Sequence, residues 1–395
     1  MNSLILKPKR EKSLLRRHPW IFSGAIQQVD GNPVSGETVS LLSLQGDLLA
    51  LAAYSPTSQI RARVWTFDPN EKVDAEFFRK RIQRAISARH ALNIAGTSDA
   101  YRLIHAESDG LPGLIVDRYG DMLVLQSLTA GSEFWKETIA NILLEETGLN
   151  TIYERSDADV RELEGLPPVI GLLRGVLAES RIVIRENGLK FNINLEAGHK
   201  TGYYLDQRQN RLHVRELSQG RDVLDCFCYT GGFTVNALEG SARSVMAVDA
   251  SADAVALGRE NVLLNGQQAE NVEWREGDVF QVLRKLRDEA RSFDLIVLDP
   301  PKFAPTAAQA EKAARGYKDI NLLAFKLLRP GGILVTFSCS GGVDAPLFQK
   351  IIASAALDAG VEAQIIDVLS QGADHPVALN FPEGAYLKGL VCLKI

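Results

Sequence analysis

The sequence predicts an α/β protein in three parts: a small N-terminal β-barrel, a central α+β domain and a doubly wound, Rossmann-like C-terminal domain. The chain has 395 residues, which is too long for one ordinary domain. Residues 1–70 show short strands and turns, whereas strands alternate with helices from about residue 185. We therefore place the three domains at residues 1–72, 73–183 and 184–395.

The N-terminal part has the pattern of a small sheet. Residues 60–67 alternate in character, which places Arg61, Arg63, Trp65 and Phe67 on one face. Arginines mixed with aromatic rings suit phosphates and stacked bases, so Arg61 and Arg63 are candidate RNA-binding residues. Alternatively, the aromatic rings fill the core of the barrel. The predicted strands are 4–6, 37–42, 48–54 and 60–67.

The distribution of charge indicates a polyanionic partner. The net charge is −5, yet residues 1–90 hold 14 Lys and Arg against 8 Asp and Glu, and the rest of the chain holds 30 against 41. A basic front end on an acidic protein favours a module that faces nucleic acid. A solvated basic face would give the same pattern.

Composition excludes several other classes. Hydrophobic residues make up 46% and charged residues 24%, as in ordinary globular proteins, and no apolar run is long enough for a membrane span. No apolar stretch follows the basic N-terminus, so we expect no secretory signal and a cytoplasmic location. The four cysteines lack the spacing of a zinc site, so we expect no metal and no disulfide framework.

Residues 73–183 predict a small α+β domain without a catalytic constellation. A helix over 74–92 begins at the N-cap Asp74 and carries a stripe of apolar residues that includes Phe78 and Ile82. We expect its far side to be basic and exposed, with Arg79, Lys80, Arg81, Arg84 and Arg89. The remaining predicted elements are strands at 103–104, 114–116, 122–126 and 151–154 and a helix at 133–146.

The C-terminal part predicts a mostly parallel sheet with a helix after each strand. In such sheets ligands bind outside the carboxyl ends of the strands, so the residues that follow each strand are the candidate site. The predicted strands are 223–224, 244–248, 272–276, 293–298 and 332–337, and the last helix is 346–359.

The first three strand ends predict a nucleoside cofactor without phosphates. Gly231 and Gly232 let a ligand approach the backbone, but the Gly-x-Gly-x-x-Gly pattern of dinucleotide sites is missing. Asp249 can accept both ribose hydroxyls and Asp278 the adenine amino group, although each acid alone could be a helix N-cap. Carboxylates also stabilise a sulfonium, so the predicted cofactor is S-adenosylmethionine. Its candidate contacts are Asp225, Phe227, Tyr229, Thr230, Gly231, Gly232, Asp249, Ser251, Asp278, Val279 and Asp299.

The last two strand ends carry motifs that favour different reactions. The turn Asp299-Pro300-Pro301 resembles the Asn/Asp-Pro-Pro-Tyr loop of amino methyltransferases and favours N-methylation of a purine, unless it is only a rigid turn. Cys339 favours a pyrimidine, because a thiolate that adds to C6 makes C5 nucleophilic; otherwise it is a small buried hydrophobe. Asp299 would hydrogen-bond the base, and Lys302 is a candidate for activating the thiol.

Six stretches of the chain stand in the order found in a known family: RRHPWIFSG at 16–24, ESDGLPG at 107–113, GHKTGYYLDQR at 198–208, YTGGF at 229–233, DPPKF at 299–303 and FSCS at 337–340. In these stretches, and end to end, the chain resembles the bacterial 23S ribosomal RNA cytosine-C5 methyltransferases of the large-subunit methyltransferase I type.

This resemblance implies an N-terminal PUA domain, which is a small RNA-binding barrel, then a central α+β domain and a class I methyltransferase domain. It implies that Cys339 is the nucleophile and that Gln207 lies against the cofactor. Arg16, Arg17 and Lys200 stand in the matching stretches and are candidate RNA-binding residues. The implied partners are 23S rRNA, free or in an early large-subunit particle, and a second copy of the chain.

The wider RNA cytosine-C5 methyltransferases often carry a second cysteine where this chain has Lys302, so another group must assist the final elimination. The predicted function is methylation of C5 of a cytosine in 23S rRNA through a covalent adduct between Cys339 and C6. Two alternatives stay open: N-methylation of an RNA purine, and a non-catalytic RNA-binding factor for ribosome assembly. The intact Asp249 and Asp278 argue against the second.

Overall fold

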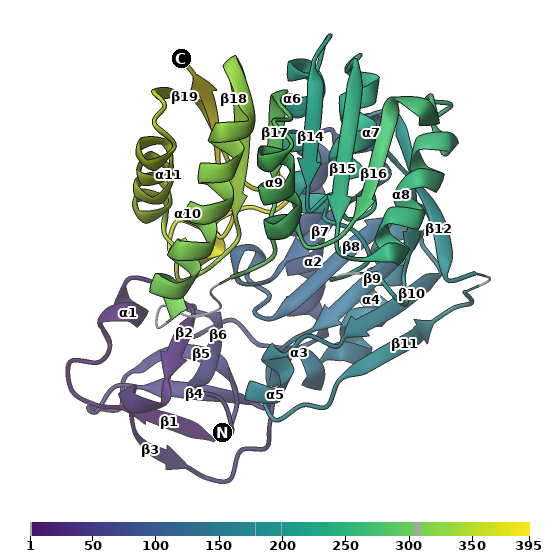
Figure 1. The fold of residues 1–395 in the computed structure, drawn as a ribbon. Coiled ribbons are helices and arrows are strands. Elements are labelled where there is room, and N and C mark those ends of the chain that lie inside the picture. Colours follow the sequence, from purple (N-terminus) through teal and green to yellow (C-terminus); the bar gives the residue numbers. More distant parts are fainter. Residues whose placement is uncertain (1, 178, 199, 304–308) are drawn as a thin grey trace. The chain divides into compact units, whose positions relative to one another are not determined.

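The computed structural model describes residues 2–177, 179–198, 200–303 and 309–395 (Figure 1). Its contacts divide the chain into two compact units, each made of three segments. The first unit comprises Met1–Arg185, Ile193–Leu205 and Ala373–Gly384, and the second comprises Glu186–Asn192, Asp206–Gly372 and Ala385–Ile395. His199, within the matching stretch at 198–208, lies outside the described residues.

The first unit begins with a six-stranded sheet in the order β2-β6-β5-β4-β1-β3. Neighbouring strands are antiparallel except β1 and β4, and the inward side chains, such as Leu4, Leu41 and Val64, form one cluster. Four strands were predicted and are confirmed, whereas β2 and β3 were not predicted. The elements are β1 (Ser3–Leu6), α1 (Lys12–Leu15), β2 (Trp20–Phe22), η1 (Ser23–Ala25), β3 (Ile26–Asp30), β4 (Thr38–Leu42), β5 (Leu48–Tyr54) and β6 (Ile60–Thr66).

The face of β6 that was predicted to meet RNA is partly buried. Trp65 is 3% exposed, and its ring packs edge-on against Phe78, with 5.2 Å between the centroids. Arg63 is 6% exposed and donates a 2.7 Å hydrogen bond to the carboxylate of Glu164. Trp65 is therefore a core residue, as the alternative interpretation expected, but it packs in the cluster of the central domain and not in the core of the barrel. Arg63 makes a buried ion pair and offers RNA almost no surface.

The rest of the first unit is a five-stranded sheet in the order β11-β10-β9-β8-β7, with a helix before it and helices after β9 and β10. Strands β9 and β10 are parallel and the other neighbours are antiparallel. The elements are α2 (Ala75–Ala91), η2 (Ile94–Gly96), β7 (Ala100–His105), η3 (Ala106–Asp109), β8 (Leu114–Tyr119), β9 (Met122–Ser127), α3 (Ala130–Phe134), α4 (Lys136–Thr147), β10 (Thr151–Ser156), α5 (Val160–Leu163) and β11 (Val169–Arg174).

Helix α2 begins as predicted, because the Asp74 side chain accepts the backbone N–H groups of Glu76 and Phe77. The prediction that Arg89 is exposed is wrong. Its guanidinium is buried and donates to both carboxylate oxygens of Asp109, at 2.8 and 2.7 Å, and to the carbonyl of Asp374 at 3.0 Å. Helical spacing alone could not reveal these partners, because they come from distant parts of the sequence.

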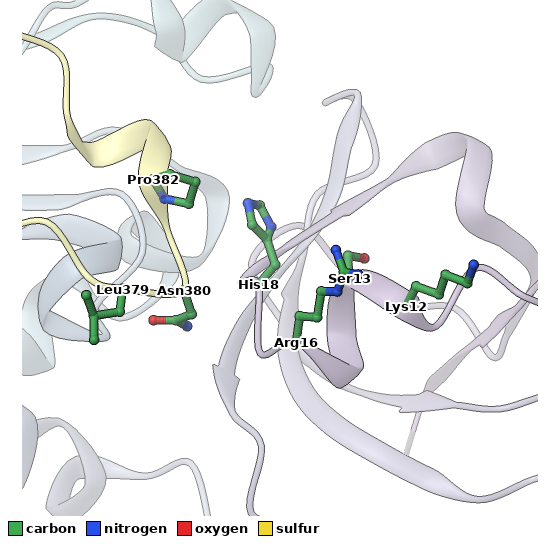
Figure 2. A pocket seen from close by; sticks show the side chains of 7 residues that line it. All are labelled: Lys12, Ser13, Arg16, His18, Leu379, Asn380 and Pro382. Atoms are coloured by element: carbon green, nitrogen blue, oxygen red, sulfur yellow. The ribbon is translucent and has the colours of Figure 1, made fainter.

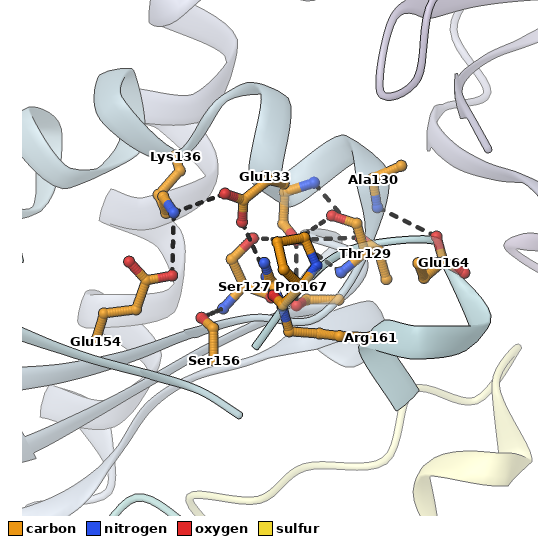
Figure 3. Close-up of polar contacts among 12 residues, drawn as sticks. Ser127, Thr129, Ala130, Glu133, Lys136, Glu154, Ser156, Arg161, Glu164 and Pro167 are labelled. Carbon is orange, nitrogen blue, oxygen red and sulfur yellow. Dashed lines mark hydrogen bonds and ion pairs between the residues drawn. The ribbon is translucent and has the colours of Figure 1, made fainter. Parts of the chain in front are cut away.

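A second buried polar network joins α3, α4, α5 and β10 (Figure 3). Arg161 is 1% exposed and lies 2.9 Å from a carboxylate oxygen of Glu133. The Lys136 ammonium donates to Glu133 at 2.7 Å and to Glu154 at 3.0 Å, while Glu164 accepts the backbone N–H of Ala130 at 3.1 Å. Because these charges satisfy one another, they hold the domain together rather than forming a reactive site.

The second unit contains a seven-stranded sheet in the order β16-β15-β14-β17-β18-β20-β19. The first five strands are parallel, and β20 runs antiparallel to both of its neighbours. The predicted doubly wound sheet is confirmed, whereas β19 and β20 were not predicted. The elements are α6 (Arg208–Leu217), β14 (Asp222–Cys226), α7 (Gly232–Glu239), β15 (Ser244–Asp249), α8 (Ala252–Leu264), η5 (Ala269–Asn271), β16 (Val272–Glu276), α9 (Val279–Asp288), β17 (Phe293–Leu298), α10 (Ala310–Leu327), β18 (Leu328–Ser338), α11 (Ala345–Ala359), β19 (Ala363–Leu369) and β20 (Lys388–Lys394).

Helices α9, α10 and α11 pack with the sheet around one large apolar cluster, and α6, α7 and α8 pack with one another. Four short elements complete the described part of the fold: the paired strands β12 (Arg181–Glu186) and β13 (Leu189–Asn194), and the turns η4 (Leu205–Gln207) and η7 (Pro382–Gly384). Within the described ranges, no helix has both the length and the apolar character needed to cross a membrane.

Candidate cofactor and catalytic site

The candidate site lies at one edge of the seven-stranded sheet. Because β14 to β18 run parallel, their carboxyl ends meet along the same edge. Backbone hydrogen bonds tie these ends together, from Cys228 to the carbonyl of Val248 at 3.0 Å and from Asp299 to that of Cys226 at 3.4 Å. The structure thus brings the predicted cofactor residues of the strand ends to one place.

The loop after β14 has an unusual backbone. Phe227 and Tyr229 have φ values of 61° and 48°, a left-handed conformation that costs a side-chain-bearing residue about 1 kcal/mol or more. Gly231 has φ 77°, and a Cβ atom there would lie 3.1 Å from the ring of Trp274. The loop keeps this shape through its contacts, among them the 2.8 Å bond from the Tyr229 N–H to Asp249.

The acids after β15 and β16 are placed differently. Both oxygens of the half-buried Asp249 accept backbone N–H groups, from Tyr229 at 2.8 Å and Ser251 at 2.9 Å, which fixes the direction of the carboxylate. Asp278 is exposed and caps α9 by accepting the N–H of Gln281 at 3.0 Å, so the N-cap interpretation holds for it. Ser251 caps α8, and Val279 is buried at the start of α9.

Asp225 is a buried acid at this edge whose pKa is strongly raised. It is 1% exposed, one of its oxygens accepts the Thr234 hydroxyl at 2.6 Å, and the other has no hydrogen-bond partner within the described part of the chain. The pKa of Asp225 is raised to about 7, chiefly by burial; the hydrogen bond from Thr234 lowers it, and the negative charges of Asp299 and Asp249 also raise it. An uncompensated buried carboxylate is complementary to a cationic ligand.

Two further expected cofactor contacts of the second unit, Gln207 and Thr230, are buried polar residues. Gln207 is 2% exposed, and its side-chain oxygen accepts a 2.6 Å hydrogen bond from Asn210. Its neighbour Asp206 accepts the Tyr386 hydroxyl at 2.6 Å. Thr230 is buried, and its hydroxyl has no hydrogen-bond partner among the described residues, so a ligand could satisfy it.

Cys339 differs from the other three cysteines. Cys226, Cys228 and Cys392 are buried, and burial raises the pKa of each thiol. Cys339 is half-buried and follows the last residue of β18, beside the parallel strand β17 that ends before Asp299. Cys339 is therefore partly accessible at a strand end, whereas the other three cysteines are core residues.

Sequence reasoning missed two residues around this cysteine. The hydroxyl of Ser340 accepts the Phe303 N–H at 3.1 Å and bonds to the buried Tyr317 hydroxyl at 3.0 Å, which ties β18 to the loop after β17. Lys388 of β20 donates to the carbonyl of Ser340 at 2.8 Å. The predicted activator, Lys302, is exposed in the same loop as Phe303.

The candidate RNA-binding residues lie on the first unit. A pocket of about 410 Å³ has α1 on one side and residues 379–382 on the other (Figure 2), and it is lined by Lys12, Ser13, Arg16, His18, Leu379, Asn380 and Pro382. Arg17 is exposed near the Phe67 ring, and Lys200 is exposed with its ammonium 4.5 Å from the Tyr204 ring. Arg61 is half-buried and donates to the carbonyl of Ser55 at 3.3 Å.

A second pocket, of about 400 Å³, shares Lys12 and Ser13 with the first and adds two more cations and two aromatic rings. The additional lining residues are Lys9, Arg10, Trp20, Ile21, Phe22, Gly24 and Ala25. Cations beside partly exposed rings suit a nucleic-acid backbone with unstacked bases. In the described portion of the chain, no three His, Cys, Asp or Glu side chains are grouped so that they could hold a metal ion.

Comparison with known proteins agrees with this geometry. A model of S-adenosylmethionine-dependent methyltransferases matches residues 172–358, and a model of a PUA-like domain matches residues 4–67. Two relatives named ribosomal RNA large subunit methyltransferase I are similar over 98% of both chains. The one from Shewanella amazonensis is 53% identical over 386 residues, and the one from Aeromonas hydrophila is 52% identical over 390.

Two solved structures share the fold over 100% of both chains. A S-adenosylmethionine-dependent methyltransferase from Streptococcus mutans superposes with a TM-score of 0.85 at 22% identity, and a methyltransferase complexed with SAH superposes with 0.87 at 23%. The predicted fold class is therefore confirmed, with a PUA-like barrel at the N-terminus. The predicted cofactor, S-adenosylmethionine, is confirmed by the family model.

Proposed function

The chain belongs to the ribosomal RNA large subunit methyltransferase I family, and on this premise we propose that it methylates C5 of a cytosine in 23S ribosomal RNA. The observation that carries the choice of reaction is the half-buried Cys339 at the end of β18, beside the strand end that bears Asp299. Nitrogen methylation needs no such thiol, whereas C5 of a pyrimidine becomes nucleophilic only after a nucleophile adds to C6.

The acidic residues at the carboxyl ends of β14 to β16 support the proposal that S-adenosylmethionine binds at this edge of the sheet. When bound, S-adenosylmethionine supplies a methyl group on a cationic sulfur, and the buried Asp225 with its negative neighbours is complementary to that charge. Asp249 is oriented by two N–H groups and can accept the ribose hydroxyls, while Asp278 can accept the adenine amino group. We assign further contacts to Gln207, Phe227, Tyr229, Thr230, Gly231, Gly232, Ser251 and Val279.

In the proposed reaction, the Cys339 thiolate adds to C6, and the electron pair of the C5–C6 double bond makes C5 nucleophilic. Asp299 hydrogen-bonds the base edge and stabilises the ring nitrogen, which takes a proton from water during the addition and returns it to water when the C6–S bond breaks. C5 then takes the methyl group, and the electron pair of the broken sulfur–methyl bond stays on the sulfur of the cofactor. Asp299 or a water next removes the C5 proton. The C6–S bond then breaks, and Cys339 leaves as a thiolate.

The PUA-like barrel is proposed to bind the rRNA. Arg16 supplies charge at the first pocket, and the exposed Arg17 is the next residue in the chain. Lys200 and Arg61 are weaker candidates because each already contacts other groups of the protein. Arg63 takes no part in this proposal, since it is buried against Glu164. The predicted domains at 1–72, 73–183 and 184–395 are kept as a proposal, although Ala373–Gly384 packs with the first unit.

The test is methyl transfer to unmodified rRNA, followed by mass spectrometry of the nucleosides. We expect 5-methylcytidine from the wild type and from the Cys392→Ala control, and none from Cys339→Ala. Methylation by Cys339→Ala at the wild-type rate would refute the thiol mechanism. A methylated purine as the product would favour the alternative, N-methylation at the Asp299-Pro300-Pro301 turn.

A further inference from the structure

Lys388, on the strand that comes last in the chain, lies close to the proposed nucleophile Cys339. Strand β20 lies between β18 and β19, and its antiparallel register pairs Lys388 with Ser338, the residue before Cys339. The Lys388 ammonium donates a 2.8 Å hydrogen bond to the carbonyl of Ser340, the residue after Cys339. Lys388 therefore contacts the residues on both sides of Cys339, although it follows Cys339 by 49 positions in the sequence.

We propose that the Lys388 ammonium holds the sulfur of Cys339 as a thiolate, so that it is ready to add to the pyrimidine. This inference rests on the proposed function. A cation next to a cysteine stabilises the thiolate relative to the thiol, which would otherwise be mostly protonated at neutral pH. The thiol proton passes to water before the RNA binds. An ammonium has three donors, and the bond to Ser340 uses one of them.

The charges that face Lys388 agree with this pairing. Burial lowers the pKa of Lys388, the negative charges of Cys339 and of Asp344 at the N-terminus of α11 raise it, and the charge of Lys302 lowers it. The interaction between Lys388 and the thiolate is mutual, so each stabilises the charged form of the other.

Lys388 suits the role better than Lys302. Lys302 is exposed in a loop, where water and salt screen its charge, whereas Lys388 is half-buried on a strand of the sheet. The strand end that carries Cys339 is itself fixed, because the Ser340 hydroxyl bonds to Phe303 and Tyr317. Both partners of the pair therefore stand on rigid elements.

The competing explanation is that Lys388 only ties β20 to its neighbours. Lys394 does that at the other end of the same strand, where its ammonium donates to the carbonyls of Phe325 at 2.9 Å and Leu328 at 2.6 Å. Lys394 is partly buried like Lys388, and burial lowers its pKa in the same way. It is thus a matched control with no role near the cysteine.

The experiment measures alkylation of Cys339 by iodoacetamide in the full chain as a function of pH, with peptide mass spectrometry to identify the modified cysteine. We expect Lys388→Met to slow the reaction at pH 7 about tenfold, the change that follows from a rise of about one unit in the pKa of the thiol. Lys388→Arg keeps a cation and should keep the wild-type profile, and Lys394→Met should leave it unchanged.

An unchanged profile in Lys388→Met, or an equal shift in Lys394→Met, would overturn the inference. Circular dichroism confirms that each variant is folded, and Lys388→Gln, which also removes the cation, replaces Lys388→Met if that variant is not. Alkylation needs neither RNA nor cofactor, so its result is independent of the proposed function. If Cys339→Ala methylates rRNA normally while Lys388→Met shifts the profile, the pairing is real but the proposed reaction is wrong.

Discussion

Replacing Asp225 with Asn should stabilise the cofactor-free protein at alkaline pH and weaken cofactor binding. The pKa of Asp225 rises from 3.8 to about 7 on folding, chiefly because the side chain is buried. A group whose pKa is raised in the folded state contributes stability at low pH that is lost as the pH rises through the folded pKa. The wild type should therefore lose stability between about pH 4 and pH 7.

The size of the effect follows from the pKa values. Between the unfolded and folded pKa, each pH unit costs about 1.4 kcal/mol, so stability falls by about 3 kcal/mol from pH 5 to pH 8. Asp225→Asn lacks this loss and can still accept the Thr234 hydroxyl. The exposed Asp278, changed to Asn, is the control that should show no such difference.

Urea unfolding without cofactor at both pH values measures this difference, and calorimetry measures cofactor affinity. We expect Asp225→Asn to gain on the wild type by up to about 3 kcal/mol as the pH rises from 5 to 8, while binding S-adenosylmethionine more weakly. If the two proteins show the same pH dependence, Asp225 is not a strained, uncompensated carboxylate and the electrostatic argument for the cofactor site fails.

Three further predictions concern a buried ion pair, the glycine of the cofactor loop and a buried histidine. Arg89→Met leaves the buried Asp109 unpaired and should lower the free energy of unfolding by about 3–5 kcal/mol in urea, whereas a loss below about 1 kcal/mol would mean that the pair is well solvated. Gly231→Ala forces a Cβ atom into a left-handed, crowded position and should weaken cofactor affinity at least tenfold by calorimetry; unchanged affinity would show that the loop can relax. Burial and nearby cations lower the pKa of His105, so the unfolded state takes up a proton that the folded state refuses, and stability should fall as the pH drops below about 6.5. Urea midpoints of His105→Gln should lack that part of the fall, and an equal fall in both proteins would contradict the assignment.

Strand-end residues could be predicted from the sequence because a local rule places them. In a parallel sheet every strand ends at the same edge, so Asp249, Asp299 and Cys339 could be expected there without knowledge of the packing. The roles proposed for them follow from the residue types. The rule does not predict how deeply each side chain is buried. Asp225 and Asp278 look alike in the sequence, but Asp225 is buried and Asp278 is exposed.

Long-range partners could not be predicted in this way. Lys388 lies beside the end of β18 because β20 is inserted antiparallel between β18 and β19, a pairing that no spacing in the sequence reveals. The alternation of β6 was correct, but the burial of Trp65 depends on packing against Phe78 from the next helix. Likewise, the position of Arg89 on its helix was correct, and only its distant acceptors made it a buried residue.

The segment Ala373–Gly384, which returns from the second unit to complete the first, has a consequence for biosynthesis. The backbone N–H of Arg102 and the side chain of Arg89 bond to Asp374, which follows them by 272 and 285 residues. Although its barrel and most of its sheet leave the ribosome early, the first unit must wait for almost the whole polypeptide before these bonds can form. The first unit can therefore be completed only after translation is nearly over, even if its barrel begins to fold earlier.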